Sequence, residues 1–257
     1  MPPTPNDVLD AALRDADAAG LTPPQLQRRV RTAFRTIARR TDPTLTLEIG
    51  AFEAGFSRWV ARELPSARAV AFEANPMVWA HHRDDVTALG VEYLNLAIGP
   101  ENGPVTLNVP RDFDGRARDP VNRMASLGSN LRSEEQVPVE VPGVRLDDAV
   151  PLTPQDRLVA WIDVEGALGA VLPASGETLR RAAAVYVEVE AEPMWDGQWL
   201  DRDVLEWFEG IGMVPLLRDR QRREQYNVLL VPRSAASMPE VAQVVRRALR
   251  PAPSPAA

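Results

Sequence analysis

The segment EIGAFEAGFS at positions 48–57 lies where an apolar run typical of a strand gives way to a helical pattern. A dinucleotide-binding loop has glycine at its middle position, where Phe52 stands and would obstruct a pyrophosphate. A P-loop requires a lysine, and Phe56 replaces it. Glu48 and Glu53 would add negative charge beside any phosphate. The segment therefore disfavours phosphate binding.

A positively charged nucleoside fits the same residues better. S-adenosylmethionine carries an ammonium and a sulfonium that acids attract, and its carboxylate can meet a helix N-terminus. The next apolar run ends at Glu73, which places an acid at the carboxyl end of a strand, where ribose hydroxyls are bound. We predict that Glu48 and Glu73 belong to an S-adenosylmethionine site, with Glu73 as the ribose ligand. For both residues the alternative is an acid exposed at the end of a strand.

Two further acids follow the apolar run of residues 158–163. Alternation along a strand places Asp163 and Glu165 on one face, and crowding with Glu188 could raise the pKa of one of them. A hydroxyl group needs a general base before it attacks a methyl group, so we predict that Asp163 and Glu165 are catalytic. Alternatively, Asp163 positions the cofactor and Glu165 caps the next helix. Clustered carboxylates also suit Mg²⁺, but we assign no metal ligand.

The residue types that the chain lacks exclude other chemistries. The 257 residues include no lysine and no cysteine, which excludes Schiff bases, thiol nucleophiles, disulfides and thiolate metal sites. His81 and His82 are adjacent, so they cannot form the one-turn-apart zinc pair of a helix, and we expect both to face solvent. A net charge of −7 disfavours a general nucleic-acid surface.

The composition is that of an ordinary globular protein, with 45% hydrophobic and 25% charged residues. No apolar run approaches the roughly 20 residues that span a bilayer, and the N-terminus lacks the layout of a signal peptide. We therefore expect a cytoplasmic protein that acts on a small molecule and has no nucleic-acid or membrane partner. The sequence leaves the oligomeric state open.

From Leu45 onward, short apolar runs alternate with helical stretches, a pattern that predicts a mostly parallel sheet with helices on both faces. The predicted strands cover 45–49, 68–73, 91–98, 158–163, 184–190, 212–218 and 225–232. The predicted helices cover 56–64, 76–89, 168–182 and 201–211. Because no helix separates the last two strands, they should form an antiparallel hairpin.

Two helices are predicted before the first strand, over residues 6–19 and from about 22 to 40. The second has apolar residues on one face and four arginines on another, which are Arg28, Arg31, Arg35 and Arg39. A solvated surface is the usual explanation for such a row, and a contact for an anionic acceptor or partner is the alternative. Another helix is expected at 239–249, before a disordered tail. We divide the chain into a helical extension (1–44), a catalytic domain (45–232) and a C-terminal helix with its tail (233–257).

A polar segment without periodicity, residues 111–136, separates two extra strands expected at 103–109 and 137–146. Its arginines, Arg116, Arg118 and Arg123, could close over an acceptor as a lid, or the segment could be a disordered insert. Trp207 is expected in the core. Trp195 and Trp199 could stack on a flat or sugar-like acceptor.

The run from about Leu45 to Pro232 resembles the FkbM-type S-adenosylmethionine-dependent methyltransferases, a class I Rossmann-like family that acts largely on hydroxyls of sugars and polyketide-like natural products. The resemblance rests on the order of the motifs EIGAFEAGFS, AFEANP, NLAIG, RLDDAV, WIDVEGALGAVL, VYVEVE and YNVLLVP. It implies a seven-stranded class I methyltransferase fold and O-methylation of such a natural product. The alternatives are a nitrogen or carboxylate acceptor, a non-catalytic S-adenosylmethionine-binding or assembly protein and a nucleotide-linked dehydrogenase.

The resemblance also implies further cofactor-binding residues. Backbone around Gly50, Ala51 and Gly55 would hold the methionine end, and Ser57 would reach its carboxylate. Ala74 and the residues from Asn95 to Ala97 would flank the adenine. The sequence departs from the family pattern, because residues other than the usual asparagine, lysine and glutamate stand at Phe52, Trp161 and Leu168.

Overall fold

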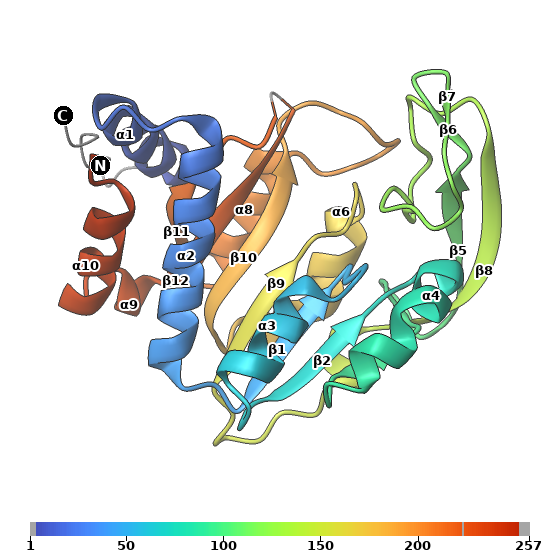
Figure 1. Cartoon of the computed structure of the whole chain (residues 1–257), viewed down its shortest axis with the longest axis horizontal. Coiled ribbons are helices and arrows are strands. Elements are labelled where there is room, and N and C mark those ends of the chain that lie inside the picture. Colours follow the sequence, from blue (N-terminus) through green and yellow to red (C-terminus); the bar gives the residue numbers. More distant parts are fainter. Residues whose placement is uncertain (1–3, 223, 252–257) are drawn as a thin grey trace.

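The structure is organised around one seven-stranded sheet. The computed structural model describes residues 4–222 and 224–251. Its main sheet has the order β11-β12-β10-β9-β1-β2-β3, in which β12 alone runs against the other strands (Figure 1). The strands are β1 (Leu45–Ile49), β2 (Arg68–Phe72), β3 (Glu92–Leu94), β9 (Leu158–Ile162), β10 (Ala182–Glu190), β11 (Met213–Arg218) and β12 (Gln225–Pro232). The predicted mostly parallel sheet and its antiparallel final hairpin are confirmed.

The middle strands of the sheet are buried almost throughout, and Thr46 and Glu48 of β1 are buried along with its apolar residues. Every residue of β1 is buried, as is every residue of β9 except Trp161. Burial of this kind is typical of parallel strands that helices cover on both faces. A hydrophobic cluster accordingly lies on each face, and the successive residues Val70 and Ala71 of β2 belong to different clusters.

Helices cover both faces of this sheet. Ala71 belongs to the hydrophobic cluster that includes residues of α2, α3, α4 and α10, whereas Val70 belongs to the cluster that includes residues of α5, α6, α7 and α8. Figure 1 shows α2 and α3 in front of the strands and α8 behind them. The helices are α1 (Pro5–Ala18), α2 (Pro23–Thr41), α3 (Gly55–Glu63), α4 (Pro76–Thr87), α5 (Leu146–Ala149), α6 (Leu168–Val171), α7 (Gly176–Leu179), α8 (Asp201–Gly210), α9 (Arg233–Ala236) and α10 (Pro239–Ala248).

α2 begins with the capping pattern that its sequence predicts. The side chain of Gln25 accepts a hydrogen bond from the Thr22 amide at 2.9 Å, and Pro23 opens the helix. The ring of Phe34 is fully buried, with its centroid 5.3 Å from those of Phe56 and Tyr186. α2 therefore packs against the main sheet, whose first strand begins at Leu45.

The division of the chain into 1–44, 45–232 and 233–257 stays a prediction. The tail at 252–257 lies outside the described residues.

The single strand predicted at 91–98 is wrong in one respect, because the chain there enters two sheets. β3 joins the main sheet, whereas β4 (Ala97–Ile98) joins a three-stranded sheet in the order β4-β8-β5. Asn95 lies between them and donates side-chain hydrogen bonds to the carbonyls of Glu73 and Ala74 at 2.8 and 3.1 Å. These bonds draw the chain out of line with β3, a contact between distant residues that local hydropathy does not reveal.

The helix predicted over 168–182 is interrupted. The structure has α6, then a 3₁₀ turn (Leu172–Ser175), then α7. Pro173 lies in that turn and has no amide hydrogen to continue the α-helical bonding. β10 then begins at Ala182, two residues before its predicted start at 184.

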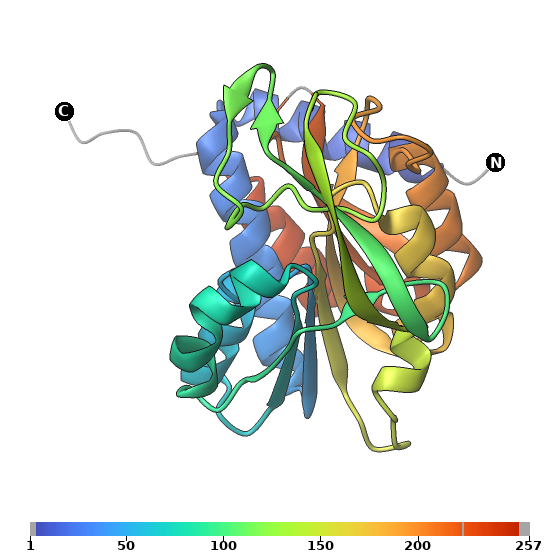
Figure 2. The ribbon, with the colours of Figure 1, turned by 90° about the vertical axis from the view of Figure 1, so that its right-hand side faces the viewer.

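The polar segment 111–136 is folded back over the carboxyl edge of the sheet. It contains a small hairpin of β6 (Asp112–Phe113) and β7 (Arg116–Ala117), and it links β5 (Gly103–Pro110) to β8 (Gln136–Val144). The carboxylate of Asp112 accepts hydrogen bonds from Ser133, Glu134 and Glu135. Figure 2 shows this region, in green, facing the viewer. The segment is folded, which disagrees with the interpretation as a disordered insert, and its role as a lid stays a prediction.

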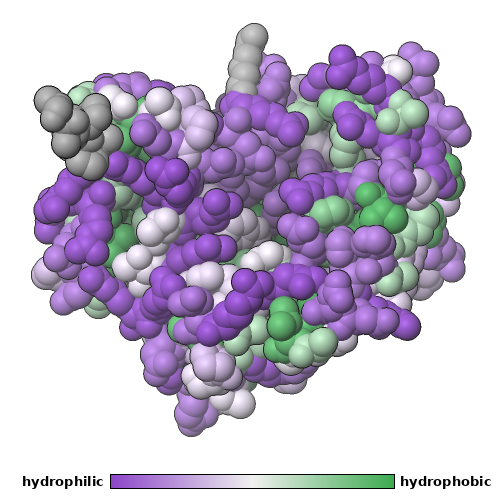
Figure 3. All heavy atoms as spheres, in the orientation of Figure 1, coloured by the Kyte–Doolittle hydropathy of each residue, from purple (hydrophilic) through white to green (hydrophobic). Residues whose placement is uncertain are grey.

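No helix in the described part of the chain is both long and apolar enough to cross a membrane. The face drawn in Figure 3 is mainly hydrophilic, and its hydrophobic residues form small separate patches.

Candidate active site

A cavity of about 630 Å³ opens at the carboxyl ends of the parallel strands. Its floor comes from the turns that follow β1, β2 and β9 and from the last residues of β10. The segment 111–136 covers one side, with Arg118, Asn122 and Arg123 among its lining residues. Ligands of open parallel sheets bind at this edge, so the cavity is the candidate active site.

The turn after β1 has an unusual backbone. Gly50, Phe52 and Ala54 have φ angles of 76°, 47° and 54°, a region that favours glycine. The amides of Gly50 and Ala51 both donate to the carbonyl of Phe72, at 3.0 and 2.9 Å. The turn is therefore held against the end of β2. This places the predicted residues Gly50, Ala51 and Gly55 along the cavity wall.

Glu48 forms part of the cavity wall but already caps a helix. Its carboxylate accepts hydrogen bonds from the amides of Phe56 and Ser57, at 2.9 and 2.7 Å, in the first turn of α3. Burial raises its pKa to about 7, and these two hydrogen bonds oppose that rise. Ser57 is 1% exposed and is not among the residues that line the cavity. The sequence predicts that a ligand carboxylate binds at the start of α3. In the structure the carboxylate of Glu48 already accepts the hydrogen bonds of two amides there.

Glu73 directly follows β2 and lines the cavity at the carboxyl end of that strand, as the sequence predicts. Its two oxygens accept hydrogen bonds from the amides of Phe52 and Asn75, at 2.7 Å each. Burial raises its pKa to about 7. Each carboxylate oxygen can accept more than one hydrogen bond, so Glu73 can still receive a hydroxyl. Ala74 and Ala97 also line the cavity. Asn95 does not line it, but its side chain donates a hydrogen bond to the carbonyl of Glu73 in the turn after β2.

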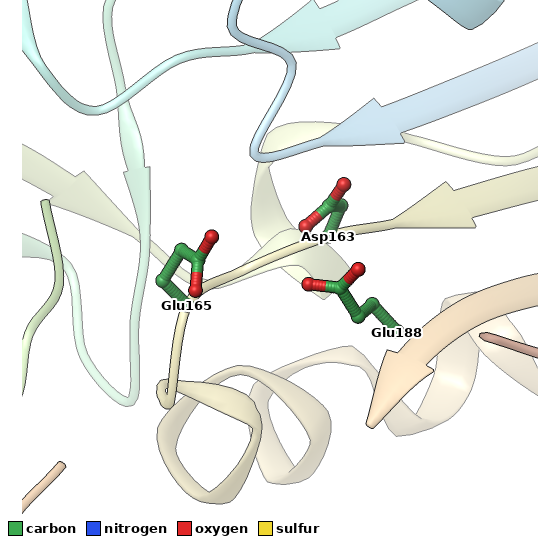
Figure 4. A group of neighbouring side chains, drawn as sticks. All are labelled: Asp163, Glu165 and Glu188. Atoms are coloured by element: carbon green, nitrogen blue, oxygen red, sulfur yellow. The ribbon is translucent and has the colours of Figure 1, made fainter. Parts of the chain in front are cut away.

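Asp163, Glu165 and Glu188 form a cluster of acids in the wall of the cavity (Figure 4). One carboxylate oxygen from each lies within 4.8 Å of the other two. Gln225 of β12 donates hydrogen bonds to Glu188 and Glu165 at 3.1 and 3.3 Å. The predicted crowding is present.

Burial and mutual repulsion set the charge state of this cluster. Burial is the first cause that raises the pKa of Asp163, Glu165 and Glu188, and the charge of Asp163 raises the pKa of the other two further. Because these carboxyl groups lie close together, the charge of one disfavours ionisation of the others. A divalent cation could use the same spacing, but an acidic cluster alone does not establish one.

Two aromatic predictions are corrected. Trp195 is 1% exposed and Trp199 is half-buried, and neither lines the cavity. A Cβ atom at Gly166 would come within 2.5 Å of Trp195, and one at Gly169 within 2.8 Å of Trp199. A glycine at each position leaves room for the adjacent indole ring, and the enclosed ring of Trp195 is not free to stack on an acceptor. Trp161 instead lines the cavity.

The structure adds cavity residues that the sequence did not assign to a site. Gln221 and Arg222 come from the turn between β11 and β12, and Gln225 is the first residue of β12, which only the sheet order brings beside β10. Arg31 and Arg35 of α2 also line the cavity. The sequence shows that these arginines are four residues apart. It does not show which face of α2 meets the cavity. Neither His81 nor His82 lines it; His81 is exposed and His82 packs beside Phe52.

Comparisons with known proteins identify relatives of this chain. Residues 40–222 match the family model described as the methyltransferase FkbM domain. Over 209 residues the chain is 26% identical to the 2-O-methyltransferase NoeI of Sinorhizobium fredii, covering 77% of this chain and 85% of that protein.

Two solved structures are similar at lower identity. A putative O-methyltransferase from Klebsiella pneumoniae is 16% identical, with a TM-score of 0.47, and the match covers 90% of this chain and 91% of that one. The methyltransferase FkbM from Methylobacillus flagellatus is 11% identical, with a TM-score of 0.44, over 74% of this chain and 44% of that one.

Proposed function

Because the chain belongs to the FkbM methyltransferase family, whose model matches more than half of its length, we propose that it transfers a methyl group from S-adenosylmethionine to a hydroxyl group of a sugar or polyketide-like natural product. The observation that carries the proposal is the cluster of Asp163, Glu165 and Glu188 in the same cavity as the glycine turn, with Asp163 directly beside Gly50. A relative named as a 2-O-methyltransferase supports oxygen as the acceptor atom.

The lining of the cavity fits S-adenosylmethionine. Six acidic residues line it, namely Glu48, Glu53, Glu73, Asp163, Glu165 and Glu188. Burial without a cation costs free energy when these groups are ionised, and a ligand with an ammonium and a sulfonium relieves that cost. A diphosphate would increase it. The lining therefore favours S-adenosylmethionine over a dinucleotide.

Each predicted cofactor residue has a role in this proposal. Glu73 accepts hydrogen bonds from the ribose hydroxyls, and the side chains of Ala74 and Ala97 flank the adenine. The turn of Gly50, Ala51 and Gly55 holds the methionine end. Asn95 and Glu48 act indirectly, because Asn95 fixes the turn after β2 and Glu48 fixes the start of α3. Ser57 contributes its amide to Glu48.

The cofactor supplies an activated methyl group, and the protein must position the acceptor oxygen and remove its proton. Asp163 lies at the end of β9, and Glu165 faces the same cavity. A base must be ionised to accept a proton, and a positively charged ligand in the cavity favours the ionised form of nearby carboxyl groups. Gln225 holds Glu165 and Glu188 in place through its amide group. We assign Asp163 and Glu165 to proton removal.

The test is a transfer assay with S-adenosylmethionine labelled in its methyl group and a panel of glycosides, natural-product alcohols, amines and carboxylic acids. We expect transfer to an alcohol. Asp163→Asn and Glu165→Gln should lower the turnover rate about 100-fold while changing the affinity for S-adenosylhomocysteine much less.

Three results would contradict parts of the proposal. Transfer only to amines or acids would change the acceptor class. Full activity in both variants would remove them as bases. A wild-type protein that binds neither S-adenosylmethionine nor S-adenosylhomocysteine would refute the cofactor.

A further inference from the structure

The cavity has two positive side chains on the side formed by α2. Arg31 and Arg35 are one helical turn apart, so they lie on one side of the helix, and both line the cavity. The segment that matches the family model begins at residue 40, so this pair lies outside it. A feature outside the matched domain therefore contributes to the wall of its site.

Arg35 lies beside the helix that begins at the cavity. Its guanidinium carbon is 5.0 Å from the ring centroid of Trp59 in α3. The side chain is half-buried, and within the described residues its Nε atom is buried without a hydrogen-bond partner. Burial lowers the pKa of Arg35, and the nearby Glu48 opposes this. The cation is held close to the methionine end of the proposed cofactor site.

Arg39 and Arg40 on the same helix differ from Arg31 and Arg35, because each has a hydrogen-bonding partner. Arg39 pairs with Glu63 of α3 at 2.7 Å, and Arg40 donates to the carbonyl of Glu240 at 2.9 Å. Among the described residues, neither Arg31 nor Arg35 has an ion pair with an acid. Arg35 is a partly buried cation without an anion, so it has capacity for a negatively charged ligand, and the exposed Arg31 lies one helical turn away.

The start of α3 cannot bind the carboxylate of a ligand by itself. Glu48 already takes the amides of Phe56 and Ser57, the donors at which a ligand carboxylate would otherwise bind. A second carboxylate placed there would also meet the charge of Glu48. It therefore needs a cation beside it.

We propose that Arg31 and Arg35 form the binding subsite for the carboxylate of the methionine part of S-adenosylmethionine. The inference rests on the proposed function, because it assumes that this ligand occupies the cavity. The zwitterionic end of the ligand then meets both signs of charge: acids face its ammonium and sulfonium, and α2 faces its carboxylate.

The test is calorimetric binding of two ligands that differ only in this group. One is S-adenosylhomocysteine, and the other is its decarboxylated analogue, which keeps the amine and the nucleoside. The proteins are wild type, Arg31→Gln, Arg35→Gln, the double variant and Arg28→Gln. Arg28 is the matched control, because it lies on the same helix but lines the groove beside α10 instead of this cavity.

We expect the double variant to bind S-adenosylhomocysteine at least about tenfold more weakly than wild type, with a smaller loss in each single variant. Affinity for the decarboxylated analogue should be unchanged in all variants. Arg28→Gln should behave as wild type with both ligands.

Other outcomes separate the possible failures. Equal weakening of both ligands would show that the arginines only support the fold, and unchanged binding of S-adenosylhomocysteine would show that the carboxylate binds elsewhere; either overturns the inference. If wild type binds neither ligand, the proposed function itself fails. Thermal unfolding of each variant shows whether it is folded before binding is compared.

Discussion

Gly50 and Asp163 meet backbone to backbone at the floor of the cavity. A Cβ atom at Gly50 would lie 1.8 Å from the carbonyl oxygen of Asp163, closer than any real contact allows. The amide of Asp163 also donates to the carbonyl of Ile49 at 2.9 Å. The cofactor turn and the acid assigned to proton removal are therefore fixed to each other by the pairing of β1 with β9.

Gly50→Ala should destabilise the protein strongly. The new methyl group collides with main chain, which cannot rotate away as a side chain can, and φ at this position is 76°. We expect a loss of at least about 2 kcal/mol in the free energy of unfolding, measured by denaturant titration. Gly210→Ala is the control, because nothing lies within 4 Å of its added Cβ and alanine favours the helix. Equal stability of the two variants would contradict the tight approach.

Glu73→Gln should weaken the binding of S-adenosylhomocysteine by about tenfold or more. The substitution keeps the size of the side chain but replaces an oxygen that accepts hydrogen bonds with a group that donates them. Calorimetry measures the effect. The control is Glu92→Gln, since Glu92 pairs with Arg68 on the outside of the sheet. An affinity equal to that of wild type would remove Glu73 as the ribose ligand.

The ligand-free protein should lose stability as the pH rises from about 5 to 8. Burial raises the pKa of Glu48, Glu73 and Glu190 to about 7, above the value of 4.5 for an unperturbed glutamate. The folded state therefore binds protons more tightly than the unfolded state. The resulting stability is fully present below the unfolded pKa and is lost as the pH rises through the folded one.

Glu190→Gln should reduce that loss, because Glu190 is 2% exposed and the substitution removes one buried ionisation. The measurement is the free energy of unfolding at several pH values. Glu92→Gln should keep the wild-type slope in this range, since Arg68 lowers the pKa of Glu92. If the free energy of unfolding rises with pH over this range, the buried acids ionise at little cost and the prediction is wrong.

Arg123→Ala should speed the release of S-adenosylhomocysteine several-fold without much change in stability. The guanidinium of Arg123 lies 4.4 Å from the ring centroid of Phe52 and 3.7 Å from the carboxylate of Glu53, so it joins the segment 111–136 to the cofactor turn. Both partners of this ion pair are largely exposed, and such pairs contribute little to folding. Stopped-flow kinetics measures release, and Arg116→Ala, which does not line the cavity, is the control. If both variants release the ligand at the same rate, the segment is not a lid.

Much of the fold could be predicted because its signals are local. The apolar run of β1, the capping residues Thr22 and Gln25 of α2 and the hairpin without an intervening helix each depend on neighbours along the chain. The acids at the ends of strands were predictable for the same reason, since a parallel sheet brings those ends to one edge. The boundary errors at 91–98 and 168–182 arose where Asn95 and Pro173 redirect the chain.

By itself, the sequence determined the sheet, the glycine turn and the residue types that can meet a cationic cofactor and activate an acceptor. Only the tertiary structure decided that Glu48 caps α3, that Trp195 is enclosed beside Gly166, and that Arg31 and Arg35 face the cavity while Arg39 pairs on the surface. The physical reason is that periodicity fixes which face of an element is apolar. The surroundings of a polar side chain depend on packing between residues far apart in the chain.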